Sequence, residues 1–306
     1  MDGSLMNLKK TSIKQKIYAD LNMQHTSNNN TLKLLKCAHK YGFTDIAFSV
    51  DFNLSDVKRK IKSNRKRDTD GIVLISSEQT WKFPEPPSIL QNAEINQYLK
   101  DHNDIHVFNR INVTIDDNQN LSLLRCDLVK KFDLISISPT SLDTLKFICQ
   151  SNSFKPEIIS LDQLKFNETL PIPYKIIKAA AKRGIVFEVN YANSIEDSIC
   201  LQNFISMTSA YCSSLNCQAM ILNSGAANAL QIRSPHDIIS LHSLFNINEN
   251  QFRKLLIDNP KKVLNLASTI RHTSSGMFYA DQENIDLLFD ENVNESDDSQ
   301  LNEELN

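Results

Sequence analysis

Residues 106–117 read HVFNRINVTIDD, a run in which apolar residues alternate with large polar ones. Such alternation is typical of a β-strand with two different faces, and here Arg110 and Asn112 share one face while Ile111 and Val113 share the other. A charged side chain beside an amide is unusual in the middle of an ordinary buried sheet. Because a barrel places polar residues near the ends of its strands, the run predicts a barrel strand.

Two further stretches follow the same pattern, YADLN at residues 18–22 and VFEVNYA at residues 186–192. Since residues of one parity converge inside a barrel, we expect a polar cluster at the barrel mouth, formed by Asp20, Asn22, Arg110, Asn112, Glu188 and Asn190. The cluster has a functional interpretation, as a vestigial active site or an RNA-facing cluster, and a structural one, as an internal network in which Asp20 and Glu188 neutralise Arg110. The high cost of an unpaired buried cation favours the internal network.

Strand and helix patterns alternate along the rest of the chain. The expected strands are residues 17–22, 45–50, 106–115, 132–138, 157–161, 185–190 and 218–222, and helical patterns such as residues 174–182 and 198–215 separate them. This order predicts an α/β fold, a TIM-barrel-like domain with about seven parallel strands. We assign residues 1–16 to a flexible extension, 17–276 to the barrel and 277–306 to an acidic disordered tail.

Charge is distributed unevenly along the 306 residues. The formal net charge is -3, but the last 26 residues hold ten acidic side chains and no Lys or Arg, so the remainder is basic by seven charges. With 41% hydrophobic residues the chain can bury one large core. A mildly cationic folded part favours a polyanionic partner without establishing one.

The connection over about residues 51–104 is longer than a simple crossover needs, and we interpret it as a basic insertion. It contains KRKIKSNRKR, whose seven cations are Lys58, Arg59, Lys60, Lys62, Arg65, Lys66 and Arg67. These cations could contact RNA phosphates, direct nuclear import, or form a solvated loop. No aromatic residue is interleaved, so the predicted contact is with the RNA backbone rather than with bases.

Arg233 could reach a phosphate or a carboxylate, which makes it a further candidate RNA contact. It lies in LNSGAANALQIRSPHD, after the last expected strand, where small residues would let another chain approach closely. A tight connection between a strand and a helix explains this segment equally well.

The six cysteines are widely spaced, and only Cys212 and Cys217 lie close together in sequence. With no second pair to complete a zinc site, they indicate free thiols in a reducing compartment. No stretch reaches the roughly 20 apolar residues of a membrane span, and the first residues lack an apolar signal core. We therefore expect an intracellular protein without a membrane partner.

The order of YADLN, FNRINVTIDD, FDLISISPTS, RGIVFEVNYANSIEDS, ILNSGA and QIRSPHDIISL resembles the thirty-kilodalton protein subunit family of ribonuclease P and ribonuclease MRP. The resemblance runs from about residue 17 to about residue 273. It implies a seven-stranded TIM-like barrel related to the polymerase and histidinol phosphatase (PHP) phosphoesterases. It also implies work in the nucleus or nucleolus, where an RNA subunit removes the 5′ leader of precursor tRNA, beside a small ferredoxin-like protein and other subunits.

The enzyme hypothesis can be tested at the end of the first strand. A PHP phosphoesterase begins its metal site there with a His-x-His pair, whereas this chain reads Asn22-Met23-Gln24. We therefore expect no catalytic residue, no metal and no cofactor, although His25 could still reach a metal held by Asp20. A stand-alone metal-dependent phosphoesterase is the alternative function. A scaffold that acts only through its ferredoxin-like partner is a third hypothesis.

Overall fold

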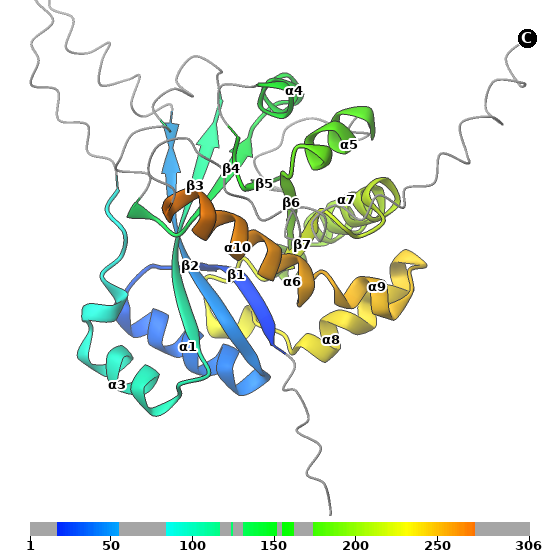
Figure 1. Ribbon diagram of the computed structural model, residues 1–306. Helices are drawn as coiled ribbons and strands as arrows, with labels where there is room; N and C mark the ends of the chain where they lie inside the picture. Colours follow the sequence, from blue (N-terminus) through cyan, green and yellow to red (C-terminus); the bar gives the residue numbers. More distant parts are fainter. Residues whose placement is uncertain are drawn as a thin grey trace, which may run out of the picture.

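The computed structural model describes residues 17–54, 84–116, 124, 131–151, 155–161 and 174–272. Seven parallel strands lie side by side in sequence order and form a nearly closed barrel (Figure 1), which confirms the predicted fold class. The strands are β1 (Tyr18–Gln24), β2 (Phe43–Asn53), β3 (His106–Ile115), β4 (Leu134–Pro139), β5 (Ile158–Ser160), β6 (Val186–Asn190) and β7 (Met220–Asn223).

The helices connect successive strands or follow β7. They are α1 (Asn28–Tyr41), α3 (Ala93–Asp101), α4 (Leu142–Gln150), α5 (Tyr174–Lys182), α6 (Ala192–Glu196), α7 (Ser198–Leu215), α8 (Pro235–Ser240), α9 (Glu249–Arg253) and α10 (Asp258–His272), with short 3-10 turns η1 (Ile89–Gln91), η4 (Ala229–Gln231) and η5 (Leu241–Phe245). Helix α1 ends before Gly42, which adopts φ 96° and whose N–H donates to the carbonyls of Ala38 and His39.

Two apolar cores lie on the two sides of the strands. Residues of one parity, such as Ile111 and Val113 on β3 and Phe187 on β6, form the large outer core beneath the helices. The opposite parity points into the barrel, where Ala19, Leu21, Ala47, Leu134, Ile158 and Ile221 form a second, smaller core. The two-residue period of the strands separates the two cores except in β1, where a register shift between Asp20 and Met23 leaves Leu21 in the inner core and Met23 in the outer one.

Helix α10 completes the inner core. Its residues Val263 and Ala267 are buried against the strand residues of that core, and α10 crosses the strands in Figure 1. Helix α10 begins at Asp258, so Asn259 lies within its first turn. The Asn259 side chain donates to the carbonyls of Cys217 and Met220, at 2.8 and 2.6 Å, and so fixes α10 to the start of β7.

The barrel closes between β1 and β7 through few backbone contacts. One isolated bridge joins Met23 to Ala226, and the N–H of Gly225 donates to the carbonyl of Asn22 at 2.8 Å. Side chains supply further closure, since the Leu21 N–H donates to the Asn223 Oδ1 atom at 2.9 Å. We call this junction the β1–β7 seam.

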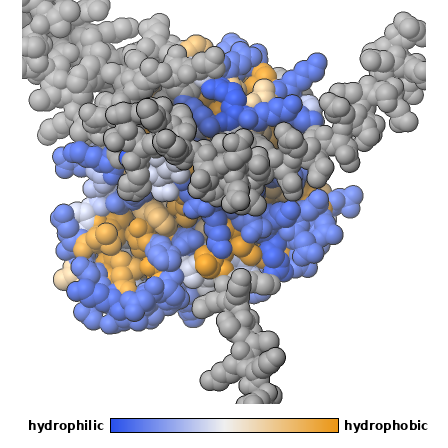
Figure 2. Space-filling model, viewed as in Figure 1, coloured by the Kyte–Doolittle hydropathy of each residue, from blue (hydrophilic) through white to orange (hydrophobic). Residues whose placement is uncertain are grey.

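Apolar residues also reach the surface on one side. Figure 2 shows them between α3 and the adjoining ends of β2 and β3, with hydrophilic residues around them. Among the exposed large apolar side chains is Leu90 of η1, just before α3, at 55%. The described remainder of this face is mostly hydrophilic.

The terminal extension, the acidic tail and most of the basic insertion lie outside the described residues. Strand β2 continues to Asn53, so the crossover to β3 begins slightly later than residue 51. Within that crossover the structure describes η1 and α3.

Candidate functional site

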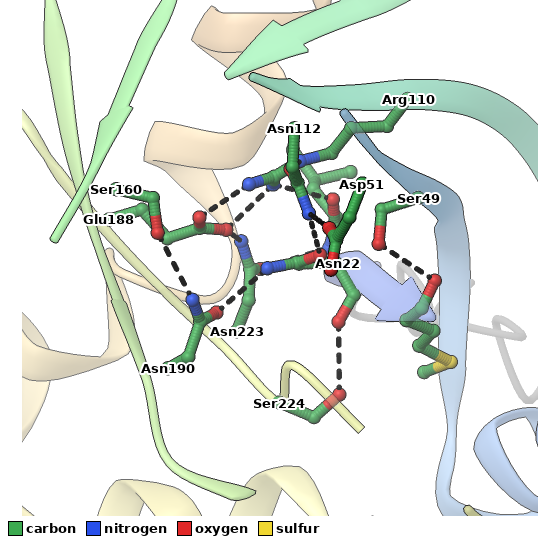
Figure 3. A network of polar contacts seen from close by, with 12 residues as sticks. Asn22, Ser49, Asp51, Arg110, Asn112, Ser160, Glu188, Asn190, Asn223 and Ser224 are labelled. Atoms are coloured by element: carbon green, nitrogen blue, oxygen red, sulfur yellow. Dashed lines mark hydrogen bonds and ion pairs between the residues drawn. The ribbon is translucent and has the colours of Figure 1, made fainter. Parts of the chain in front are cut away.

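A buried ion pair lies at the centre of the barrel. Arg110 on β3 donates across the interior to Glu188 on β6, with its Nη1 and Nη2 atoms bonding the two carboxylate oxygens (Figure 3). Both side chains are 0% exposed. Arg110 also donates to the Leu21 carbonyl at 2.7 Å, and Asn223 donates to Glu188 at 2.5 Å. Burial alone would raise the pKa of Glu188, but the charge of Arg110 and these hydrogen bonds outweigh it and lower that pKa.

The ion pair fixes the orientation of three amides. Because a guanidinium can only donate, the Arg110 Nε atom sets the Asn112 Oδ1 atom toward itself at 2.7 Å, which leaves the Asn112 amide nitrogen to face Asn22 at 3.3 Å. The Asn22 amide nitrogen then donates to Asn190 at 3.2 Å, and Asn190 donates to Ser160 at 3.2 Å. Ser160 in turn bonds Glu188.

Together with the bond between Ser160 and Glu188, the contacts drawn in Figure 3 form a circuit, which we call the polar ring, of Arg110, Asn112, Asn22, Asn190, Ser160 and Glu188. Each amide has one orientation that satisfies its neighbours. The ring is therefore preorganised, because each amide both accepts from one neighbour in it and donates to the next.

Asp20 lies in the β1–β7 seam. Its carboxylate accepts the Ser224 N–H with both oxygens at 3.2 Å and the Asn22 N–H at 3.2 Å. Burial raises the pKa of Asp20 to about 6, although these hydrogen bonds act in the opposite direction. Of the two predicted partners of Arg110, only Glu188 pairs with it in the described contacts, whereas Asp20 binds backbone groups.

Above the ring is a cavity of about 60 Å³ at the carboxyl ends of the strands, which we call the mouth pocket. Its lining residues are Asn22, Gln24, Asp51, Asn112, Ser138, Ser160, Leu161, Asn190, Ala192, Asn193, Ser224 and Gly225. Gly225 passes close to the ring at φ 66°, and a Cβ atom there would lie 3.0 Å from the Asn190 Cβ atom. A larger residue at this position would disturb the amide of Asn190.

The end of the first strand, where the enzyme hypothesis requires a His-x-His pair, lies at this pocket. Asn22 and Gln24 line it, while Met23 between them is buried in the outer core. The ring of His25 instead bonds Thr31 of α1 at 2.7 Å, and burial lowers its pKa. The described residues contain no group of three or more His, Cys, Asp or Glu that could hold a metal ion.

Of the predicted RNA contacts, the structure describes only Arg233. The seven cations of residues 58–67 lie outside the described residues. Arg233 is exposed, and its guanidinium donates to the carbonyls of Leu230 and Ile232 at 2.8 and 3.3 Å. Arg233 therefore lies on the surface beside η4 and does not join the polar ring.

Our sequence reasoning missed Ser160, Asn223 and Asp51. Ser160 and Asn223 end strands β5 and β7 and point toward Glu188, and Asp51 accepts from Asn112 at 3.0 Å. The same strand parity that selected Glu188 and Asn190 could have identified Asn223, which lies two residues after the inward-facing Ile221.

Across the described parts of the chain, no helix is long and apolar enough to cross a membrane.

Comparison with known proteins places these features in one family. The model of the family RNase P subunit p30 matches residues 17–272. A Schizosaccharomyces pombe protein named as probable ribonuclease P protein subunit 3 is 26% identical over 189 residues, which cover 60% of this chain and 78% of that protein. A Saccharomyces cerevisiae ribonuclease P/MRP protein subunit is 23% identical over 258 residues, covering 82% of this chain and 76% of that protein.

Among solved structures, a chain of archaeal ribonuclease P with mature tRNA superposes with a TM-score of 0.55 at 14% identity. The match covers 87% of this chain and 99% of the archaeal one. The barrel fold is thus shared over nearly the whole of that subunit.

Proposed function

The chain belongs to the RNase P subunit p30 family and is a protein subunit of ribonuclease P, and we propose that it supports the particle by contacting RNA and not by breaking bonds itself. The polar ring carries this proposal. The barrel-mouth groups that could have served catalysis, Arg110 and Glu188 with their amides, are committed to one another inside the barrel. Such a site stabilises a scaffold and offers no free acid, base or nucleophile at its centre.

Contact with RNA would come from cations outside the barrel interior. We propose that the basic run at residues 58–67 binds the phosphate backbone, with Arg233 as a second contact, and that released counterions favour association. The partners would be the ribonuclease P RNA, a small ferredoxin-like subunit and other proteins of the particle.

Replacing Lys58, Arg59, Arg65, Lys66 and Arg67 with Gln should weaken RNA binding and flatten its salt dependence, by about one unit of slope for each phosphate that the variant no longer neutralises. The measurement is the affinity for the co-purified RNA at several salt concentrations. A matched control removes five exposed lysines elsewhere, Lys33, Lys36, Lys40, Lys175 and Lys182. Equal loss of affinity in both variants would show that only net charge matters and that the basic run is no specific contact.

The direct test of the proposed function is purification of the tagged protein from its native cells at gentle salt. We expect one structured RNA to be enriched and the eluate to remove 5′ leaders from precursor tRNA. Finding no RNA, together with metal-dependent phosphatase activity of the protein alone, would instead support the phosphoesterase alternative. Crosslinking to RNA with and without the ferredoxin-like partner separates direct RNA contact from the pure scaffold hypothesis.

We extend the proposal to ribonuclease MRP and to the nucleus and nucleolus. The budding yeast relative is named as a subunit of both particles, and the basic run has the composition of a nuclear import signal. Recovery of two different RNAs with the tagged chain, and a nucleolar signal of a fluorescent fusion, are the expected results. A cytoplasmic fusion would contradict the localisation.

A further inference from the structure

The mouth pocket is small and polar. Nine of its twelve lining residues are Asn, Gln, Ser or Asp, and the other three are Leu161, Ala192 and Gly225. A volume of about 60 Å³ has room for roughly four to six water molecules. That room suits a few non-hydrogen atoms of a ligand, such as one edge of a sugar ring, and not a whole nucleotide.

The charge of the pocket disfavours anions. None of its lining residues is Lys, Arg or His, and Arg110 beneath it is fully engaged by Glu188, Asn112 and Leu21. Asp51 at the rim is exposed, and its Oδ1 atom accepts from Asn112. A phosphate would meet this carboxylate, and no cation among the described lining residues would compensate for it, so this lining differs in charge from the basic run proposed to bind the RNA backbone.

The unused hydrogen-bonding groups suit hydroxyls. Within the described residues, the Oδ2 atom of Asp51 and the side chains of Gln24 and Asn193 have no hydrogen-bond partner. The amide oxygens of Asn22 and Asn112 already accept hydrogen bonds in the polar ring, so they are poor candidates for metal ligands. A hydroxyl can donate to the carboxylate and accept from an amide at the same time, and two adjacent hydroxyls can bind one carboxylate together.

We propose that the mouth pocket binds a small neutral polyol through a pair of vicinal hydroxyls, such as the 2′,3′-diol of a ribose, with Asp51 as the main acceptor. The polar ring holds Asn112 in the orientation that fixes Asp51, so the site is preorganised. The diol could come from a free sugar or from the terminal ribose at the 3′ end of an RNA. Only the binding of an RNA 3′ end, and not the binding of a free sugar, rests on the proposed function.

The test titrates the full-length, ¹⁵N-labelled protein with methyl β-D-ribofuranoside and follows the side-chain amide signals of Asn22 and Asn112. With the ligand efficiency of small ligands, we expect saturable shifts with a Kd on the order of a few millimolar. The 2-deoxy analogue, which lacks one hydroxyl, should bind about tenfold more weakly or not at all. An RNA trinucleotide with a free 3′ diol, compared with one ending in a 3′ phosphate, distinguishes the two sources.

The variant Asp51→Asn should weaken binding of the riboside at least about tenfold, because it removes the charged acceptor. Asp101→Asn is the matched control, since Asp101 is an exposed aspartate at the end of α3, next to the opposite end of β3. Equal binding of the riboside and its deoxy analogue would overturn the proposal, as would shifts produced instead by inorganic phosphate or magnesium chloride. Absence of any saturable shift would also overturn it, and RNA binding through the basic run would stand unaffected.

Discussion

Replacing Glu188 with Leu should lower the free energy of unfolding by about 3 to 5 kcal/mol, because the Arg110 guanidinium would remain buried without a counter-charge. Arg110→Met should cost a similar amount, since it strands the carboxylate of Glu188 in the same interior. Urea denaturation at neutral pH measures both effects. The pair is 0% exposed, so added salt should change these differences little.

The double variant Arg110→Met/Glu188→Leu separates pairing from packing. We expect it to cost clearly less than the sum of the two single variants, because no charge is then left unpaired. It should still be less stable than the natural chain, since Asn112, Asn223 and Ser160 lose their partners. Additive losses would show that the two side chains do not interact energetically.

An ion pair at the surface supplies the control. Arg253 and Glu249 pair on α9 at spacing i,i+4, and their side chains are 21% and 50% exposed, against 0% for both members of the buried pair. Removing the charge of Glu249 with Glu249→Gln should change stability by about 1 kcal/mol or less. A loss as large as that of Glu188→Leu would mean that burial is not the cause of the effect in the barrel.

Much of the site could be predicted because strand parity is a local property. Alternation in residues 106–117 identified Arg110 and Asn112 as neighbours on one face, and the same rule placed Glu188 opposite them. The strand count followed from equally local signals. The family resemblance independently implied the same barrel.

The partners of Asp20 could not be predicted in this way. Its acceptor role depends on the backbone N–H of Ser224, about 200 residues away in sequence, and backbone donors are identical at every non-proline position. Which N–H faces Asp20 is decided by how β1 meets β7 when the barrel closes. Ser160 escaped notice for a related reason, because a serine at a strand end becomes informative only when its distance to Glu188 is known.

Asp20 also leads to the second large effect, a dependence of stability on pH. Its pKa is about 6 in the folded chain, against about 3.9 for an unfolded aspartate. Between these two pH values the folded chain binds more protons at Asp20 than the unfolded chain does, so raising the pH lowers the free energy of unfolding. The contribution of neutral Asp20 is fully present below about pH 4 and is lost as the pH rises through about 6, a total of roughly 3 kcal/mol.

The variant Asp20→Asn isolates this contribution because it cannot ionise. The stability of the natural chain minus that of Asp20→Asn should fall by roughly 3 kcal/mol between about pH 4 and about pH 7.5, and should be flat above that. Other groups, including Glu188 with its lowered pKa, titrate in both proteins and cancel in the difference. A difference that is constant with pH would show that Asp20 is ionised throughout. The Ser224 and Asn22 N–H groups would then outweigh its burial, and the β1–β7 seam would be closed by a stable carboxylate rather than a neutral acid.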